Sequence, residues 1–360
     1  MSSHHTATFG VLVLSSVLSA QAAVVPSAYA TQSGGSASAT PFSYAAYIRH
    51  QQLIDQNQVP VGSITGMAFR SRTTVLNVQE RAWQELRVQL SHSALTLATA
   101  STNYAANHGN DLTEVFNNKF DMYKQNSNAL LEFNCTVPFS KPFLFVRTAP
   151  LVVDLYPQNF GYEFNTACGG GNGTAMDFAK DPLMVTVNPA KNSTCNNNPP
   201  NTMTGASVSP GGYVLKLFYG GDLMPYGRAC GATSSAMPVI GSAGGGATVG
   251  NNTFAVTMAG ASTAASNAFF VLGFSNRQTS VGQVRLPLDL STATPATNCW
   301  QNADLLIGFP VPMAAGASTV PAPIPNDNTL RGLELFTQFA ADEPLVSGFV
   351  TTQGGLVRIQ

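Results

Sequence analysis

The chain has 360 residues, of which 44% are hydrophobic and only 10% are charged. This composition excludes an intrinsically disordered chain, because disordered segments are poor in apolar residues and rich in charge. The formal net charge of −1 gives no electrostatic reason to expect nucleic acid or another polyanion as a partner.

An apolar run at residues 9–18 is followed by small residues and an A-x-A pattern at 20–22, with a second such pattern at 28–30. These features are typical of a secretory signal peptide, and a buried first strand is the alternative. We expect a signal peptide over residues 1–22 and a protein that is secreted to the extracellular space or the cell surface. No later segment approaches the roughly 20 apolar residues of a membrane helix, so no membrane span is expected.

Alternation of apolar and polar residues predicts a series of short strands in the first half of the chain. Residues 85–91 also fit a helix, and we interpret them as a strand with Leu86, Val88 and Leu90 on one face. Residues 103–111 (NYAANHGND) are expected to form a loop. The predicted strands span residues 49–56, 64–70, 85–91, 129–137, 142–146, 151–156, 183–187 and 213–219.

The chain is organised around the stretch 211–231 (GGYVLKLFYGGDLMPYGRACG). It alternates as a strand up to Tyr219, and the rest has the Gly, Pro and Asp residues of turns. We expect an N-terminal β-sandwich domain over 23–219, a linker at 220–231 and a C-terminal β-sandwich domain over 232–360. The predicted fold class is therefore all-β, with two antiparallel β-sandwich domains of the jelly-roll or immunoglobulin-like kind in tandem.

Further strands are predicted in the second half, and the last two are expected to form a closing hairpin with Gly354 and Gly355 in its turn. Residues 310–325 are punctuated by Pro, which confines these segments to sheet edges. The predicted strands span residues 253–258, 268–275, 281–290, 304–309, 332–339, 346–351 and 356–359.

Five cysteines are present, and export permits disulfide bonds. Pairing within each predicted domain gives the disulfides Cys168–Cys195 and Cys230–Cys299. Cys135 is left over and is in step with apolar neighbours, so it is interpreted as a buried thiol. A zinc site is not expected, because no C-x-x-C motif or Cys/His pair occurs at ligand spacing.

The C-terminal region carries the pattern I-P-N-D-x-x-L-x-G-L-x-x-x-x-Q at residues 324–338, after LPLDL at 286–290 and Cys299. This module resembles one found in a family of predicted exported β-rich proteins of environmental, planctomycete-like bacteria. The resemblance implies the fold and a bacterial setting, and because its motifs are apolar and turn residues it assigns no catalytic residue. The first half resembles the same family, in order, at residues 64–70, 107–116, 138–143 and 151–154, whereas residues 146–150 depart from its usual Gly/Asn turn.

Few residues suggest catalysis. Beyond the predicted signal peptide the histidines are His50, His92 and His108, and there is no G-x-S-x-G motif, so a Ser-His-Asp triad is not expected. The motifs of zinc proteases, P-loop proteins and dinucleotide-binding proteins are also absent. Asp154 and Asp304 each lie in an apolar strand, where a structural hydrogen-bonding role is favoured over acid–base catalysis.

Loop-like segments offer two kinds of ligand-binding candidate. Asn107, Asn110, Asp111 and Glu114 could give oxygen ligands to Ca²⁺, the one cofactor suggested, although their spacing matches no EF-hand and turn formation is the alternative. Tyr104, Tyr123 and Tyr162 are candidate platforms for stacking a sugar ring. Trp300, beside Cys299, is instead expected to pack on a disulfide. The four N-x-S/T sequons, among them 134–136 and 251–253, are interpreted as accidental.

These observations predict an exported, non-catalytic structural or adhesive protein of the cell surface or extracellular matrix. Its strand-rich, low-charge halves could also self-assemble through sheet edges. A carbohydrate-binding protein with glycan partners is the alternative. A polysaccharide hydrolase is the second alternative, and it would need two carboxylates facing one cleft.

Overall fold

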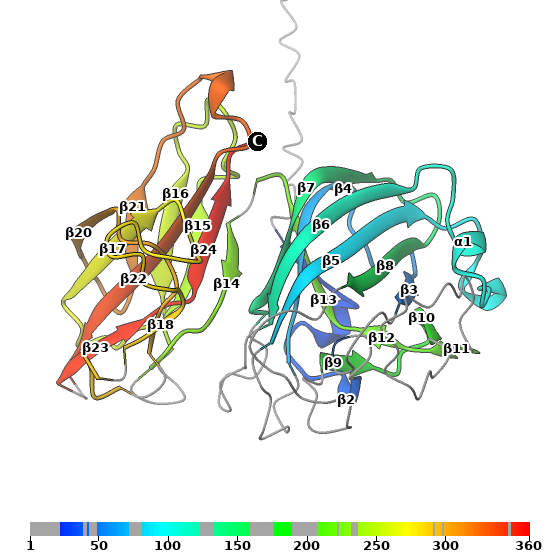
Figure 1. Cartoon of the computed structure of the whole chain (residues 1–360), viewed down its shortest axis with the longest axis horizontal. Helices are drawn as coiled ribbons and strands as arrows, with labels where there is room; N and C mark the ends of the chain where they lie inside the picture. The colour runs from blue at the N-terminus through cyan, green and yellow to red at the C-terminus, as the bar shows by residue number, and fades with distance from the viewer. Residues whose placement is uncertain are drawn as a thin grey trace, which may run out of the picture.

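The computed structural model describes residues 22–38, 42, 49–71, 81–122, 133–158, 176–188, 207–221, 223–231, 237–290, 292–296, 299–344 and 347–360. Almost all of the regular structure is β-strand, and every strand pair among these residues is antiparallel. The predicted all-β antiparallel class is confirmed. Figure 1 shows two bodies side by side, which we call the first half (β1 to β13) and the second half (β14 to β24).

The first half consists of a four-stranded sheet, a six-stranded sheet and a small three-stranded sheet. In sheet order, the four strands are β1 (Ala22–Val25), β13 (Leu215–Tyr219), β4 (Gly62–Phe69) and β7 (Cys135–Phe145). The six are β11 (Ser207–Pro210), β10 (Met184–Asn188), β3 (His50–Ile54), β8 (Leu151–Gln158), β5 (Arg81–His92) and β6 (Thr113–Met122). The three are β12 (Gly212–Tyr213), β9 (Met176–Ala179) and β2 (Gly35–Ser38).

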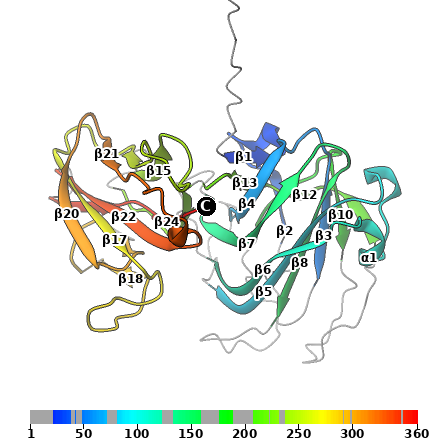
Figure 2. The ribbon, with the colours of Figure 1, turned by 90° about the horizontal axis from the view of Figure 1, so that it is seen from above.

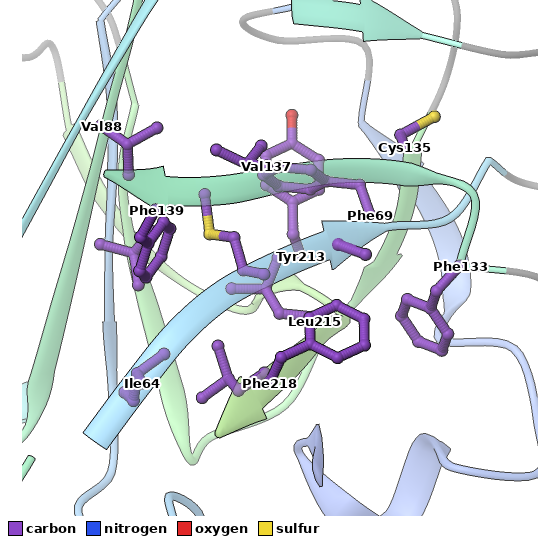
Figure 3. Packing of buried hydrophobic residues seen from close by; sticks show 14 of the residues in the cluster. Ile64, Phe69, Val88, Phe133, Cys135, Val137, Phe139, Tyr213, Leu215 and Phe218 are labelled. Carbon is purple, nitrogen blue, oxygen red and sulfur yellow. The ribbon is translucent and has the colours of Figure 1, made fainter. Parts of the chain in front are cut away.

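Alternation along β5 shows why these sheets pack face to face. Leu86, Val88 and Leu90 are at most 1% exposed, and the residues between them are partly exposed. The strand interpretation of residues 85–91 is therefore confirmed, because a helix would not bury every second side chain. The inner faces of the four-stranded and six-stranded sheets meet in one apolar core, and Figure 3 shows side chains of β4, β7 and β13 packed there.

The second half has a larger sheet packed on a three-stranded sheet around a second apolar core. In order, the larger sheet contains β14 (Met224–Tyr226), β24 (Gly354–Arg358), β22 (Glu334–Glu343), β17 (Asn267–Gly273) and β20 (Ile307–Pro312), and β23 (Gly348–Thr351) also pairs with β22. The smaller sheet contains β15 (Val239–Ala243), β16 (Ala255–Ala259) and β21 (Ser318–Pro321), and β18 (Leu288–Asp289) pairs with β19 (Trp300–Gln301) elsewhere.

In the described residues, helical structure is limited to short segments. These are the 3₁₀ turns η1 (Ser27–Tyr29), η2 (Leu97–Thr99) and η3 (Asn328–Leu330) and the single-turn helix α1 (Tyr104–Asn107). Within the described part of the chain, no helix has the length and apolar character needed to cross a membrane. Figure 2 shows that α1 lies at the end of the first half that is remote from the second half.

The Pro-rich segments lie at sheet edges, as predicted, because β20 and β21 are both terminal strands. The backbone N–H of Met313 donates to the carbonyl of Ser266 (3.3 Å), and the register continues from there into β20. Since alternate residues of an antiparallel strand bond to one neighbour, Pro310 and Pro312 occupy positions whose nitrogens face away from β17. The outer edge of β20 therefore lacks two of the donors that another strand would need.

Two strand predictions in the second half were wrong. Residues 281–290 were expected to form one strand, but only Leu288–Asp289 does, because Gly282 and Gln283 have positive φ angles of 75° and 50° and form a turn. The closing hairpin is also absent, since β23 and β24 both pair with β22. Gly354 lies within β24, where a Cβ atom would come 2.3 Å from the ring of Tyr226, so close packing and not a turn requires glycine there.

The stretch predicted as a linker, residues 220–231, contains β14 and is not simply a turn. This strand pairs with β24 at the edge of the second half's larger sheet. It also contacts the first half, where the Thr136 hydroxyl donates to the Pro225 carbonyl. Met224 and Tyr226 belong to the apolar core of the first half, together with the second-half residues Ala303, Phe336 and Leu356.

We expect Met224→Ala to lower the free energy of unfolding by about 2–5 kcal/mol, because it leaves a cavity where the two halves meet. Met224 is 1% exposed, and its Sδ atom lies so close to Gly66 that a Cβ there would be 2.5 Å away. Urea denaturation measures the change. The control Val239→Ala, at a 51% exposed site, should change stability by no more than about 0.5 kcal/mol. Equal stability of the two variants would contradict a shared core.

Candidate functional site

A buried polar cluster lies on the outer face of the six-stranded sheet, at the end near α1. Gln51 of β3 is opposite Asp154 of β8, and Ser91 of β5 lies one step further along the same face. All three side chains are at most 2% exposed. Because the outer face of an antiparallel sheet is usually solvated, their burial requires a covering element.

Residues 93–111, which connect β5 to β6 and include η2 and α1, supply this cover, and we call them the strap. An isolated bridge between Ser93 and His108 closes the strap on itself. Asn107 Nδ2 donates to Gln51 Oε1 (2.6 Å), and the Tyr104 hydroxyl donates to the Arg49 carbonyl (3.2 Å). The Arg49 guanidinium also lies 4.6 Å from the centre of the Tyr104 ring. The strap is therefore held mainly by polar and cation–π contacts.

Asp154 is the centre of the cluster. Its carboxylate accepts hydrogen bonds from Arg49 Nε (2.9 Å) and Nη2 (2.6 Å), Gln51 Nε2 (2.8 Å) and His108 Nε2 (2.9 Å). Burial by itself would raise the pKa of Asp154, but the hydrogen bonds from His108 and Arg49 outweigh it and hold the pKa below its usual value. Asp154 is thus an ionised structural acceptor, as its apolar strand predicted.

The ring of His108 links Asp154 to Ser91. Its Nδ1 atom is 2.8 Å from Ser91 Oγ, so with Nε2–H donating to the carboxylate, Nδ1 accepts the serine proton. The three residues form the hydrogen-bond chain of a Ser-His-Asp triad, which the sequence did not predict. Ser91 is nevertheless fully buried in a strand, and His108 belongs to the strap. Because the strap that covers Ser91 also carries His108, this hydrogen-bond chain fastens the strap to the sheet.

The predicted Ca²⁺ ligands are used in other contacts. Asn107 is fully buried, and its Oδ1 accepts from the Ser101 N–H (2.8 Å). Asp111 accepts from His92 Nδ1 (2.5 Å), and Glu114 from Arg87 Nε (2.6 Å), whereas Asn110 is exposed. No group of three or more His, Cys, Asp or Glu side chains placed to hold a metal ion occurs in the described residues.

The tyrosines predicted to stack on sugar rings have different outcomes. Tyr104 is 2% exposed and covered by Arg49, so the prediction is wrong for this residue, because α1 turns its ring towards the sheet. Tyr123 and Tyr162 lie outside the described residues. The sequon residue Asn134 is fully buried, and the Asn251 side chain is bonded to Gly244, Gly246 and Thr253, so neither is presented as an exposed glycan acceptor.

The Cys230–Cys299 disulfide is confirmed, with Cα atoms 4.8 Å apart. Cys135 is buried, as predicted, and its Sγ lies 3.4 Å from Asn134 Oδ1. The predicted Cys168–Cys195 pair lies outside the described residues.

The ring of Trp300 lies under the Arg228 guanidinium, 4.9 Å from it.

The motif residues of the second half also build structure. Gln338 Oε1 accepts from the Asn302 N–H (2.7 Å), and its Nε2 donates to the Trp300 and Thr352 carbonyls (2.7 and 2.8 Å). Asp304 is 3% exposed and accepts from the Ser280 N–H (2.7 Å), which matches its predicted structural role.

His50 projects from the opposite face of β3, into the first half's core. It is 1% exposed, its ring centre is 4.7 Å from that of Tyr213, and neither ring nitrogen has a hydrogen-bond partner. Burial lowers its pKa to about 4, although the nearby charge of Asp154 acts in the opposite direction. Neutral His50 is therefore part of the core.

Comparison of the chain with models of protein families and with curated protein sequences finds no match. The role of the cluster must therefore be inferred from its own geometry.

We expect Asp154→Asn to destabilise the protein by about 3 kcal/mol, because it leaves the partly buried Arg49 without its counterion and weakens the strap. Urea denaturation measures the loss, and hydrogen exchange should show faster opening at residues 104–108. The control is Glu114→Gln, which breaks an ion pair whose two side chains are each 41% exposed and should cost less than about 1 kcal/mol. Equal effects of the two substitutions would contradict the central role of Asp154.

The burial of His50 should make the stability of the protein depend on pH. The pKa of His50 is lower in the folded protein (about 4) than in an unfolded chain (about 6.5), so the unfolded state takes up the proton first as the pH falls. Between about pH 7 and pH 4.5 this should remove about 2–3 kcal/mol of stability. Denaturation at both pH values should show a smaller loss in His50→Leu, and the control His92→Gln should retain it. A loss of the same size in His50→Leu would exclude His50 as its origin.

Proposed function

We propose that this chain is an exported structural or adhesive component of the cell surface or extracellular matrix, and that it acts without catalysis. The observation that carries this proposal is the strap. It seals the one Ser-His-Asp chain found among the described residues and itself supplies the histidine. The buried polar groups around it are used to fix a loop on a sheet, which is how a rigid scaffold uses them.

Export is part of the proposal, with cleavage after Ala22. A cut after Ala30 would remove β1, which pairs with β13 and buries Val25 completely. The segment that follows β1 is also fixed, since Arg70 Nη2 donates to the Gln32 carbonyl (2.7 Å) and is paired with Asp177. A cut after Ala22 removes only the first residue of β1 and leaves the contacts of Val25 and Arg70 intact. The resemblance to exported proteins of environmental bacteria supports export.

We also propose that copies of the chain self-assemble, and that exposed apolar side chains make the contact instead of the edges of sheets. More than half of the exposed large hydrophobic residues of the described chain fall within residues 269–309. They are Phe269, Phe274, Val281, Val284, Leu305, Leu306, Ile307 and Phe309, which we call the apolar surface. Phe269 is paired with Pro310 and Phe309 with Phe270, so Phe269 and Phe309 lie on opposite faces of the sheet and the apolar surface includes both faces at this edge. Figure 2 shows the loop beside β18 projecting from the second half in this region. Pro310 and Pro312 disfavour the addition of another strand at the outer edge of β20. Contact between exposed apolar side chains is therefore the favoured way for copies to associate.

No specific observation favours the two alternatives. Of the tyrosines predicted as stacking platforms for a sugar, the one that lies in the described residues, Tyr104, is buried. A polysaccharide hydrolase needs two carboxylates free to face a substrate, whereas Asp154 and Asp304 are both occupied by structural hydrogen bonds.

Sedimentation velocity over a range of concentrations tests the proposal. We expect wild-type protein to form larger species as the concentration rises, and the double variant Phe274→Ser/Val281→Ser, at sites 59% and 81% exposed, to remain monomeric. Val61→Ser, 58% exposed in the first half, is the matched control and should assemble like wild type. A wild-type monomer at every concentration would contradict self-assembly, and an intact N-terminus on protein from the native host would contradict export.

A further inference from the structure

A surface hollow of about 450 Å³ lies between the first turn of the strap and the ends of β3 and β8. Its volume is within the range of small-molecule sites. The hollow is separate from the cluster around Asp154, because its walls come from the first residues of the strap and from the segments after β3 and before β8. The hollow is lined by residues 55–56, 93–98 and 148–150.

Apart from the side-chain amide of Gln56, the polar side chains that line the hollow are a carboxylate and hydroxyls. Asp55 contributes a half-buried carboxylate, and Ser93, Thr96 and Thr148 contribute hydroxyl groups. No Lys, Arg or His is among the described residues that line it, and Asp55 has no cationic partner among the described ion pairs. The hollow is therefore suited to a positively charged ligand and unsuited to an anion.

The remaining wall is apolar but not aromatic. Leu95, Leu97, Ala149 and Pro150 provide aliphatic surface, and the hollow has no ring on which a sugar could stack. Aliphatic walls beside a carboxylate match a ligand with a methylene stem and a charged end, since such stems pack on apolar surface while the charge stays at a polar group.

The geometry of Asp55 selects among cations. Its Oδ1 atom already accepts a hydrogen bond from the Asn57 N–H (2.8 Å). A bidentate contact with the planar fork of a guanidinium would therefore have to use the second lone pair of an oxygen that is already shared. An ammonium group is a point charge with three donors, and one oxygen of Asp55 together with neighbouring hydroxyls can satisfy it.

We infer that this hollow binds a primary ammonium group on an alkyl stem, as on a lysine side chain of a polypeptide or a free alkylamine. The site does not depend on the proposed function, because it lies in the first half and away from the apolar surface. It gives the protein a specific contact with a lysine-bearing partner, whether or not copies of the chain also associate.

Titration calorimetry with Nα-acetyl-lysine methylamide tests the inference, and we expect a dissociation constant of about 1–10 mM. The norleucine analogue, which lacks the charge, should bind at least about fivefold more weakly. n-Butylamine separates the two ligand sources: binding equal to that of the lysine compound indicates an alkylamine site, and weaker binding indicates that the polypeptide backbone contributes.

Variants locate the site. Asp55→Asn keeps the acceptor for Asn57 and should weaken binding about fivefold or more, and Ala149→Leu should block the hollow without a change of charge. The matched control is Asp327→Asn, an exposed carboxylate whose role as the cap of η3 asparagine can fill, and it should bind like wild type. The inference would be overturned if wild type showed no binding at ligand concentrations up to about tenfold above the expected dissociation constant. It would also be overturned if the norleucine compound bound equally well, or if binding survived both Asp55→Asn and Ala149→Leu.

Discussion

The first half depends on the compensation of one buried negative charge. Asp154 lies on the outer face of a sheet, where solvent would normally reach it, but the strap reduces its exposure to 2%. An unpaired carboxylate at that depth would be strongly destabilising, so Arg49, Gln51 and His108 must all point at it. Gln51 lies in β3, the strand beside Asp154, and Arg49 directly precedes that strand. His108 belongs to the strap. The position of the strap, and of the hollow beside its root, follows from this requirement.

The same solution recurs elsewhere in a chain that has few charges. Asp177 accepts from Arg70 and from the Ser33 hydroxyl, and so fixes the segment after β1 on the first half. In the second half the neutral amide of Gln338 binds the segment that carries Trp300 and Asn302. In each place one buried polar side chain pins an irregular segment to a sheet. Such contacts are worth most where water is excluded, which explains how long connections are held without a large charged surface.

The sequence could predict elements that have a local repeating pattern of residues, but not contacts between residues that are brought together only by folding. Alternation located β5 because Leu86, Val88 and Leu90 are buried and the residues between them are partly exposed. The Ser91–His108–Asp154 chain joins residues separated by 17 and 46 positions, and no local pattern marks it. Gly354 and Gly355 were misinterpreted for a related reason. A glycine pair indicates a turn or a close approach equally well, and only the neighbouring Tyr226 ring distinguishes the two.

The boundary between the halves shows the limit of dividing a chain by its turns. Gly220 and Gly221 do have the positive φ angles of a turn, 57° and 85°, where a joint was predicted. The strand that follows, β14, completes the second half's sheet while its Met224 and Tyr226 enter the first half's core. A strand that hydrogen-bonds to one body and buries its side chains in the other couples the two. Movement of either body relative to the other would therefore expose apolar side chains of both.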